Sequence, residues 1–589
     1  MTPNDVDVLS EYYQRELSYL RNAGSDFAHR YPKIARRLDL SFSESTDPHV
    51  EQLIESVAFL TGKLQKQIDD QFPEIAGTLL NVLYEPLTLP TPSCVMVNFD
   101  IDLHRAAKAP GVTVPKDTIL YSKSFSGETC SFMTAHDLFL WPVEVTSAIT
   151  IQKEHLPNYF AHSTYYLKLG LNYSPAKVYP DRLRFYINAD ALLRGKIFSA
   201  IFSTEEKVIL QKDSSYKLLN TIKPVGAEDV DSLFPYPRTV HKGFRLLQEY
   251  CAFPDKFYGF DVELPRNQNL GGESFLFIPM SYNISMQISR KNFSLSSVPA
   301  VNLFPKVTEP LHLDHRQVEY CMVPDYRRYS SNEIYMIRKM VAVASINGDE
   351  IFVPEFFACG ESSRSTNSSN IFWKSSRKKS YIKDAFGEDV YISFVDLNFD
   401  PQFFSDRIFY GHTLCTNRGL ADQIPALGEL QIELSVPARK IYCQDRPTAQ
   451  KPSLRNGEIL WKLISALSLN SISFSQDGIG KIREVLRVFA NVFGSSVERE
   501  VDAMISVDSR IITRRFDEQA WRGFVRGTNI EITFDDSVYN LGLPLSLVLS
   551  RFLSSYTSIN TFTDVSVKNI SRNGILKEWK EQFGMRSYL

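Results

Sequence analysis

The chain has 589 residues and a formal net charge of −3, with 43% hydrophobic and 23% charged residues. This composition is ordinary for a globular protein, and the length allows three or four domains. The nearly neutral charge provides no field that would attract nucleic acid or an anionic membrane, so a nucleic-acid partner is not expected.

The first strong pattern is a long amphipathic helix between residues 47 and 90. Asp47 suits an N-cap and Pro48 suits the first helical position. At about 1.5 Å per residue, residues 48–71 would span roughly 36 Å. Apolar residues recur every three or four positions on one face, as in helices that pack on other helices. They are Val50, Leu53, Ile54, Val57, Leu60, Leu64 and Ile68.

A second amphipathic helix precedes it and ends near Tyr31 and Pro32. Its apolar face contains Leu9, Tyr13, Leu17 and Leu20. The two helices could form a hairpin that covers its own apolar face, or they could enter a bundle with helices of another chain. Periodicity alone leaves both arrangements open.

After Pro92 the period changes from helical to two, which predicts strands. Val95, Val97, Phe99 and Ile101 would face one way and the residues between them the other, as in a strand covered on one side. The same alternation occurs at 165–171, 183–187 and 284–288. Short strands separated by turn residues indicate antiparallel sandwich-like or barrel-like sheets.

The fold class predicted for the whole chain is multidomain α+β. We expect an N-terminal helical region at 1–92, β-rich domains at 93–296 and 297–440, and a C-terminal α+β domain at 441–589. The Ser-rich segment 360–380, with its basic run at Lys374 and 377–379, is interpreted as a solvated loop. The C-terminal domain should contain helices from Gly457 and around 482–490, separated by a turn at 478–480. Its last helix should pack through Leu545, Leu549, Phe552 and Tyr556.

The seven cysteines are far apart, odd in number and without a C-x-x-C pair, which is typical of reduced thiols in the cytosol. The acidic N-terminus lacks the basic and apolar regions of a signal peptide. No run of about 18 apolar residues occurs. If the protein works at a membrane, a partner must take it there.

No motif for phosphate, dinucleotide or hydrolase chemistry is present, so no cofactor is expected. The strongest metal candidate is the set His312, Asp314, His315 and Glu319, in which a strand would turn His315 away from the others. The pairs Asp69–Asp70 and Asp535–Asp536 are adjacent in sequence, which does not suit a glycosidase pair. Cys415 with His412 nearby lacks a preorganising pattern for a nucleophile.

Short blocks occur in a fixed order along almost the whole chain. They include Tyr12-Tyr13-x-x-Glu16-Leu17, Phe27-Ala28-x-x-Tyr31-Pro32, Asp47-Pro48-x-Val50-Glu51, Phe72-Pro73-Glu74, Asn302-x-Phe304-Pro305, Leu414-Cys415-Thr416-Asn417, Trp461-x-Leu463-Ile464-Ser465 and Asn560-x-Phe562-Thr563. This ordered set resembles the TssF (VasA or ImpG) family of type VI secretion baseplate subunits. The Ser-rich segment after Gly360 matches no block of that family.

The resemblance implies a cytoplasmic structural wedge component rather than an enzyme. It further implies that two copies of the chain join one TssG, with the adaptor TssK, TssE, and spike and sheath components as other partners. Partners would recruit the assembly to the inner membrane without insertion of this chain. The long N-terminal helices would then bundle with partner helices, which favours the intermolecular arrangement. Cys415 would be an apolar filler and Trp461 a helix anchor.

Two alternatives belong to other settings. A tail-baseplate protein of a contractile phage-like particle would share the structural role, and neighbouring genes for capsid and terminase would distinguish it. A carbohydrate-active or glycan-binding protein would fit β-rich domains with many aromatic residues. That alternative requires a groove with convergent carboxylates and an export signal.

Overall fold

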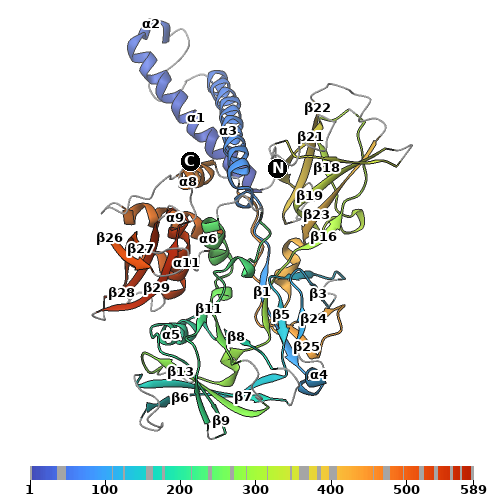
Figure 1. Cartoon of the computed structure of the whole chain (residues 1–589). Coiled ribbons are helices and arrows are strands. Elements are labelled where there is room, and N and C mark those ends of the chain that lie inside the picture. The colour runs from blue at the N-terminus through green and yellow to red at the C-terminus, as the bar shows by residue number, and fades with distance from the viewer. Residues whose placement is uncertain are drawn as a thin grey trace. The chain divides into compact units, whose positions relative to one another are not determined.

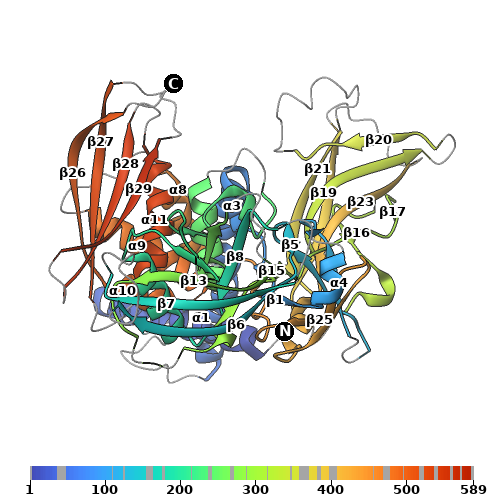
Figure 2. The same cartoon turned by 60° about the horizontal axis from the view of Figure 1, so that its bottom comes forward.

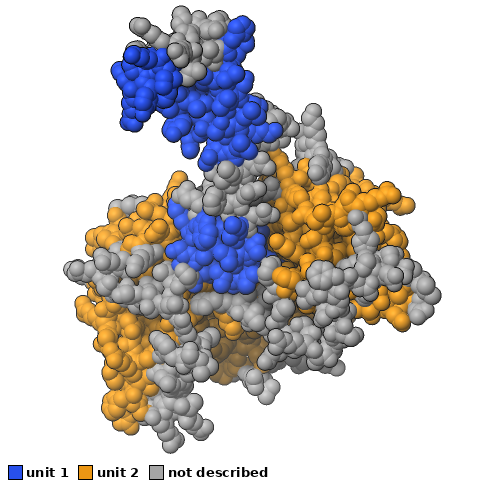
Figure 3. Space-filling view, turned by 90° about the horizontal axis from the view of Figure 1, so that it is seen from above, with its two compact units in different colours: residues 1–88, 454–467 blue, residues 89–453, 468–589 orange. Residues whose placement is uncertain are grey.

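The computed structural model divides into two compact units, which Figure 3 colours separately. Unit 1 comprises residues 1–88 and 454–467, and unit 2 comprises residues 89–453 and 468–589. Helices at the N-terminus and several largely antiparallel sheets confirm the α+β fold class. The residues described are 3–35, 48–108, 111–123, 127–153, 163–174, 179–213, 215–236, 242–265, 271–284, 286, 288–314, 316–344, 348–356, 371–380, 386–396, 407–454, 457–468, 478–494, 497–516, 523–535, 542–557, 561–570 and 574–584.

Unit 1 is helical. It contains α1 (Pro3–Arg30), α2 (Pro32–Ala35), α3 (Pro48–Tyr84), η1 (Glu85–Leu87) and most of α8 (Gly457–Ser468). The helix α3 begins at Pro48 as predicted, whereas the proposed N-cap Asp47 lies outside the described residues. The helix continues 13 residues past Gln71 and ends just before the Glu85-Pro86 pair. Tyr84 has non-helical backbone angles, with φ of −158° and ψ of 78°, and the chain then enters the 3₁₀ helix η1.

A closed barrel forms the centre of unit 2, with strand order β1-β15-β4-β3-β24-β25. Strand β1 pairs with both β15 and β25, so the barrel contains strands from both sides of residue 296. We had expected a domain boundary at this residue. The strands are β1 (Cys94–Ile101), β3 (Ile119–Ser122), β4 (Ser131–Thr134), β15 (Ser297–Val301), β24 (Glu429–Ile432) and β25 (Ala438–Cys443). A short ribbon of β2 (Val112–Val114) and β5 (Leu138–Leu140) lies in the same region of the chain.

The strand β1 is covered on both faces along its first half. Val95, Val97 and Phe99 belong to a core that includes residues of the other barrel strands. Cys94 and Met96, which point to the opposite face, are buried in a second cluster with Tyr186 and other residues. The prediction that only one face of this strand is covered is therefore wrong.

Two further sheets enclose the helix α5 (Ala191–Phe202), which has contacts with β8 and β13 (Figure 1). One sheet has the order β10-β9-β13-β7-β6 and the other β11-β12-β8-β14. Their strands are β6 (Val143–Gln152), β7 (Tyr165–Tyr173), β8 (Arg182–Ile187), β9 (Ile209–Lys212), β10 (Ser215–Leu218), β11 (Lys223–Pro224), β12 (Gly259–Glu263), β13 (Gly272–Met280) and β14 (Phe293–Ser294).

Residues 304–416 form another pair of sheets. The first has the order β16-β23-β19-β20, with β17 also paired to β23, and the second has the order β18-β22-β21. They share one buried cluster that includes Trp373, Ile392 and Phe409. The strands are β16 (Phe304–Val307), β17 (Leu311–His312), β18 (Tyr320–Met322), β19 (Glu333–Ala344), β20 (Glu350–Val353), β21 (Ile371–Lys379), β22 (Glu388–Asp396) and β23 (Arg407–Thr416).

The C-terminal part of unit 2 is a four-stranded sheet with helices on one side (Figure 2). Its order is β26-β27-β28-β29, and β27 and β28 pair in parallel. Phe244 on α6 joins the helices by contacting Phe489 on α9 and Phe552 on α11. The elements are α6 (Lys242–Ala252), α9 (Gly478–Phe493), α10 (Glu498–Asp502), α11 (Gly542–Ser554), β26 (Met504–Phe516), β27 (Gly523–Phe534), β28 (Phe562–Asn569) and β29 (Ile575–Phe583).

Three local predictions are wrong. Residues 371–379 of the Ser-rich segment form the strand β21 rather than a loop, while 360–370 lie outside the described residues. Described residues 284, 286 and 288 are not in a strand, because Ser281 N donates to Ala200 O and the chain turns away after β13. The turn expected at 478–480 is instead the start of α9.

Candidate functional site

The helices α1 and α3 lie side by side and run antiparallel in unit 1 (Figure 1). Their register follows from two contacts. Arg21 Nε donates to Glu51 Oε1 at 3.2 Å. A Cβ added at Gly62 would lie 3.2 Å from backbone atoms of Tyr12 and Tyr13. Because residue 21 faces residue 51 while residues 12 and 13 face residue 62, the two helices form a hairpin.

The face of α3 that meets α1 contains two small residues where the helices approach closely. Ala58 is completely buried, and Gly62 allows the two backbones to approach closely. On a helix, residues four apart share a face, so Ala58 and Gly62 form one contact surface. The hairpin therefore closes on this face, which we call the small-residue face and on which Ile54 is also half-buried.

The large apolar residues of α3 remain exposed in the hairpin. Leu53 is 66% exposed, Val57 41%, Leu60 60% and Leu64 58%. Residues separated by four, three and four positions lie on one side of a helix. These four side chains consequently form a continuous apolar row that α1 does not cover.

The row continues toward the end of α3. Ile75, Leu79 and Val82 are exposed, and their spacing places them on the same face as Leu53 and Leu64. We call these seven residues the α3 stripe: Leu53, Val57, Leu60, Leu64, Ile75, Leu79 and Val82. At about 1.5 Å per residue the distance from Leu53 to Val82 is roughly 44 Å. The stripe has two exposed stretches, 53–64 and 75–82, and the side chains of 66–74 between them lie outside the described residues. Exposed apolar surface of this kind marks interaction sites in soluble proteins.

The other residues predicted to pack on partner helices have mixed positions. Ile54 on α3, and Tyr13, Leu17 and Leu20 on α1, are half-buried. The side chains of Leu9, Val50 and Ile68 lie outside the described part of the chain. In α8, Trp461 is nearly half exposed, whereas Leu460 and Leu463 are buried. Trp461 thus adds an exposed aromatic ring to unit 1.

The predicted C-terminal packing residues lie inside unit 2. Leu545, Leu549 and Phe552 on α11 are buried, and Tyr556 just after this helix is half-buried. The helix α11 contacts α6, β28 and β29. Trp579 Nε1 also donates to Ser546 Oγ at 2.8 Å, which joins β29 to α11.

The metal candidate does not assemble among the described residues. His312 and Asp314 are exposed, His315 lies outside the description, and Asp314 accepts a hydrogen bond from the Tyr320 hydroxyl at 3.0 Å. Within the described ranges no group of three His, Cys, Asp or Glu residues could hold a metal ion. The Asp69 and Asp70 side chains and Asp536 also lie outside those ranges.

The burial and the pKa of Cys415 do not suit an activated nucleophile. Its side chain is completely buried, and burial raises the pKa of this thiol to about 12. Reactive cysteines have a lowered pKa and an accessible sulfur. His412 on the same strand is exposed, and its odd separation from Cys415 turns it to the other face of β23. Cys415 acts as core filler, as the structural interpretation had it.

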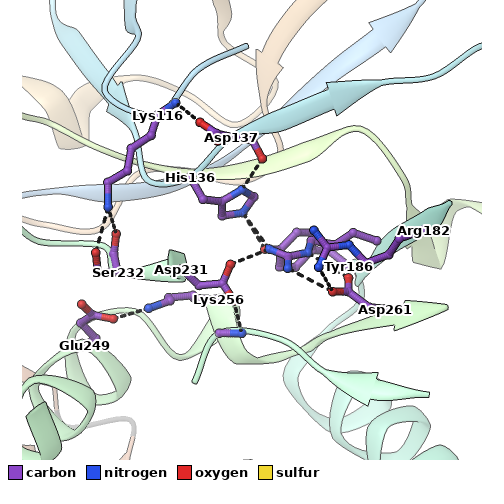
Figure 4. A network of polar contacts seen from close by, with 12 residues as sticks. Lys116, His136, Asp137, Arg182, Tyr186, Asp231, Ser232, Glu249, Lys256 and Asp261 are labelled. Carbon is purple, nitrogen blue, oxygen red and sulfur yellow. Dashed lines mark hydrogen bonds and ion pairs between the residues drawn. The ribbon is translucent and has the colours of Figure 1, made fainter. Parts of the chain in front are cut away.

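A buried polar network joins β8, β12 and the segments beside them (Figure 4). The Arg184 guanidinium binds Asp261 at 2.9 and 3.1 Å and Asp231 at 2.7 Å. Near it, His136 Nδ1 donates to Asp137 O at 2.9 Å, so Nε2 accepts from the Tyr186 hydroxyl at 3.0 Å. Burial, helped by the Arg184 charge, lowers the pKa of His136 to about 4. The imidazole is therefore neutral at physiological pH.

A second network is centred on Arg418, which is buried and has a positive φ of 51°. Its guanidinium donates to Asn332 O at 3.1 Å, to Phe386 O at 3.0 Å and to Asp389 Oδ1 at 2.9 Å. Beside it, Asn302 and Asn417 exchange two hydrogen bonds of 2.8 and 2.7 Å. These contacts connect the barrel to the sheets of residues 304–416.

Sequence reasoning missed both networks. Their members come from segments 29 to 115 residues apart, as Arg418 with Asp389 and Asn302 with Asn417 show. The one available signal was the placement of Asn302 and Asn417 in two of the ordered blocks. Their mutual hydrogen bonds show that these two blocks contact each other in the folded chain.

The fold and its surfaces define a multidomain α+β protein with two internally paired polar networks in unit 2 and an N-terminal hairpin that presents exposed apolar residues. No described helix is long and apolar enough to cross a bilayer.

Comparison with known proteins agrees with this description. The family model "Type VI secretion system, TssF" matches residues 6–586. A relative from Pseudomonas aeruginosa (strain PAO1), the type VI secretion system component TssF1, is 27% identical, and the alignment covers 99% of each chain. The chain belongs to the TssF family of the type VI secretion system. This membership favours the secretion interpretation over the phage-tail and carbohydrate-active alternatives.

Two solved structures share the fold. One is a chain of a type VI TssK-TssF-TssG baseplate subcomplex determined by cryo-electron microscopy, with a TM-score of 0.73, 20% identity and coverage of 92% of this chain and 99% of that chain. The other is a chain of a type VI baseplate complex, with a TM-score of 0.60, 19% identity and coverage of 97% and 99%.

Proposed function

We propose that this protein is a structural wedge subunit of the type VI baseplate and not an enzyme. The α3 stripe is the observation that carries the proposal, because a row of exposed leucine, valine and isoleucine side chains is costly in water unless another surface covers it. Family membership and the fold of the baseplate structures give the setting.

The partner for the stripe is a helix pair from TssG, with two copies of this chain on one TssG. Exposed residues at three- and four-residue spacing are suited to helix-on-helix packing, in which rows of side chains interdigitate. The small-residue face holds α1, so the opposite side of α3 stays available for a partner. In this arrangement the α1–α3 hairpin is the fixed joint of the wedge.

Unit 2 would supply the remaining contacts, to TssK, TssE, and the spike and sheath. Its internal networks keep the barrel and the sheets of residues 304–416 in a defined arrangement, which suits a spacer between partners. The location is the cytoplasm, and partners bring the assembly to the inner membrane.

Co-expression with TssG followed by native mass spectrometry tests the proposal. The wild-type chain should give a complex with two copies of this chain and one TssG. The triple variant Leu53→Asp, Val57→Asp and Leu64→Asp should lose TssG, since three buried carboxylates at an apolar interface are strongly unfavourable. Circular dichroism of the variant alone should match wild type, because these side chains are exposed in the hairpin.

A matched control places the same changes elsewhere. Leu218, Val318 and Ile511 are exposed apolar residues of unit 2. Their triple replacement by Asp should leave the TssG complex intact. A folded stripe variant that still forms the full complex would refute the assignment of this face to TssG.

A further inference from the structure

Unit 2 contains a cavity of about 510 Å³ that none of the preceding arguments uses. Its walls come from the turn between β2 and β3, the strand β4, residues from η3 (Asp229–Asp231) to Tyr236, the start of α6, and the strand β19. Cavities of this volume are in the range of small-ligand sites. The cavity forms only when these segments come together in the folded unit.

The charge on the cavity wall is positive. Lys116, Lys242, Arg245 and Arg338 line it together with two carboxylates, Asp117 and Asp229. Asp229 forms ion pairs with two of these cations. Lys242 Nζ lies 2.5 Å from one of its oxygens, and Arg245 Nη2 lies 2.6 Å from the other. Glu249 is completely buried nearby and forms an ion pair with Lys256 (Figure 4).

Two of the cations lack an anionic partner. Lys116 Nζ donates to the hydroxyl of Ser232 at 2.8 Å and to its carbonyl at 3.4 Å, and both acceptors are neutral (Figure 4). Arg338 is exposed on β19 and has no hydrogen-bond or ion-pair partner among the residues that the structure describes. Among the described lining residues, the cavity therefore has more positive than negative side chains.

Arg245 is held at the cavity wall with one of its donors unpaired. Its side chain is more than nine-tenths buried, and its Nε has no hydrogen-bond partner within the described part of the chain. Buried donors without an acceptor are rare in folded proteins. The guanidinium carbon lies 5.5 Å from the ring centroid of Tyr236, an aromatic residue that also lines the cavity, which is within the range of a cation–π contact.

We infer that this cavity binds an oxyanion, a carboxylate or a phosphate, carried on a body larger than the free ion. The guanidinium groups of Arg245 and Arg338 supply fork-shaped donors that match both oxyanions, and the ammonium groups of Lys116 and Lys242 supply point charges. The apolar part of the wall, with Met133, Leu233, Phe234 and Pro235, would contact the body of the ligand. The inference does not depend on the proposed baseplate role.

Calorimetric titration of the full-length chain without any partner tests the inference. The probes are sodium citrate for the carboxylate source and sodium pyrophosphate for the phosphate source, each compared with sodium chloride at equal ionic strength. At least one probe should bind saturably at one site per chain. Binding of citrate alone identifies a carboxylate ligand, and binding of pyrophosphate alone identifies a phosphate ligand.

The diagnostic variant is Arg338→Glu, which should fold because the side chain is exposed. It should weaken the binding of the active probe by about tenfold or more. The matched control is Arg510→Glu on β26, an exposed arginine outside the cavity wall, which should leave the affinity unchanged. Absence of saturable binding by both probes, or equal weakening by the two variants, would overturn the inference.

Discussion

Unit 1 and unit 2 differ in how far the chain itself covers their apolar side chains and pairs their charged ones. In unit 1 the hairpin closes on Ala58 and Gly62 and leaves the α3 stripe in contact with solvent. In unit 2, the half-buried Arg184 is bound by two carboxylates, and the buried Arg418 is bound by a carboxylate and two carbonyl groups. The difference agrees with the proposal that a partner covers the exposed apolar face of unit 1, whereas these charged groups of unit 2 are paired within the chain. Each prediction below changes one side of this comparison.

The largest effect is expected from Arg418→Met in unit 2. The variant leaves Asp389 buried without its cation and two carbonyl groups without a donor, so the free energy of unfolding should fall by roughly 3–5 kcal/mol. Hydrogen exchange of peptides from β19, β22 and β23 measures the loss. The double variant Arg418→Met with Asp389→Leu should recover part of it, and no recovery would show that the ion pair is not the cause.

Glu500 predicts a pH dependence in the same unit. Burial raises the pKa of this carboxyl from 4.5 to about 8, although Tyr250 donates to it at 2.6 Å. Between these pH values the folded chain keeps a proton that the unfolded chain releases, so stability falls as pH rises through this window. The Glu500→Gln variant should lose this pH-dependent component.

Urea unfolding at pH 5 and at pH 9 provides the measurement for Glu500. The variant should gain stability relative to wild type at pH 9, and this gain should be absent at pH 5. Taking the difference from wild type removes the contributions of other groups, including His136, whose pKa is lowered and whose window lies between about 4 and 6.5. An equal difference at both pH values would contradict the buried-carboxyl explanation.

A pair of glycine variants tests the closed face of unit 1. A Cβ at Gly62 would press on the α1 backbone at 3.2 Å, whereas a Cβ at Gly77 meets nothing within 4 Å. Gly77→Ala should therefore stabilise α3 by about 0.5–1 kcal/mol through its helix propensity. Gly62→Ala should lose this gain and weaken the protection of α1 amides in hydrogen exchange. Equal behaviour of the two variants would show that the helices are not in close contact at Gly62.

The smallest effect is expected on the open face. Leu53→Ser with Leu60→Ser should change the stability of the isolated chain by no more than about 0.5 kcal/mol, because both side chains are exposed. Thermal unfolding of the chain without partners measures this. A large loss would mean that the same chain already covers the stripe in solution.

Elements with local patterns could be predicted from the sequence. The helix α3 follows from Pro48 and from leucines at helical spacing, and β7 and β8 follow from strict alternation. Alternating apolar residues indicate burial but not strand pairing. This explains the incorrect prediction of a strand at 284–288, because Ile284 and Ile288 are buried but lie outside any described strand. The strand β21 was not predicted, because its serine, lysine and arginine residues interrupt the apolar alternation.

Long-range features could not be predicted. The barrel depends on pairing Val97 with Cys443, and no local pattern encodes that partner. The oxyanion cavity likewise depends on bringing Lys116 near Ser232 and Arg338. For the interface, periodicity identified the apolar residues of α3, but it could not show that Gly62 would direct α1 to another face of the helix.

The pairing of β1 with β25 has a consequence for synthesis of the protein. About 350 residues separate the two strands, so the barrel cannot close until residue 443 has left the ribosome. At about 5–20 residues per second, that takes roughly 20–70 s after β1 emerges. The helix α3 has no such requirement and is already made, with its leucines exposed, throughout this interval. Cells that produce this chain thus have a long cotranslational period in which a partner or a chaperone can capture the amino-terminal helices.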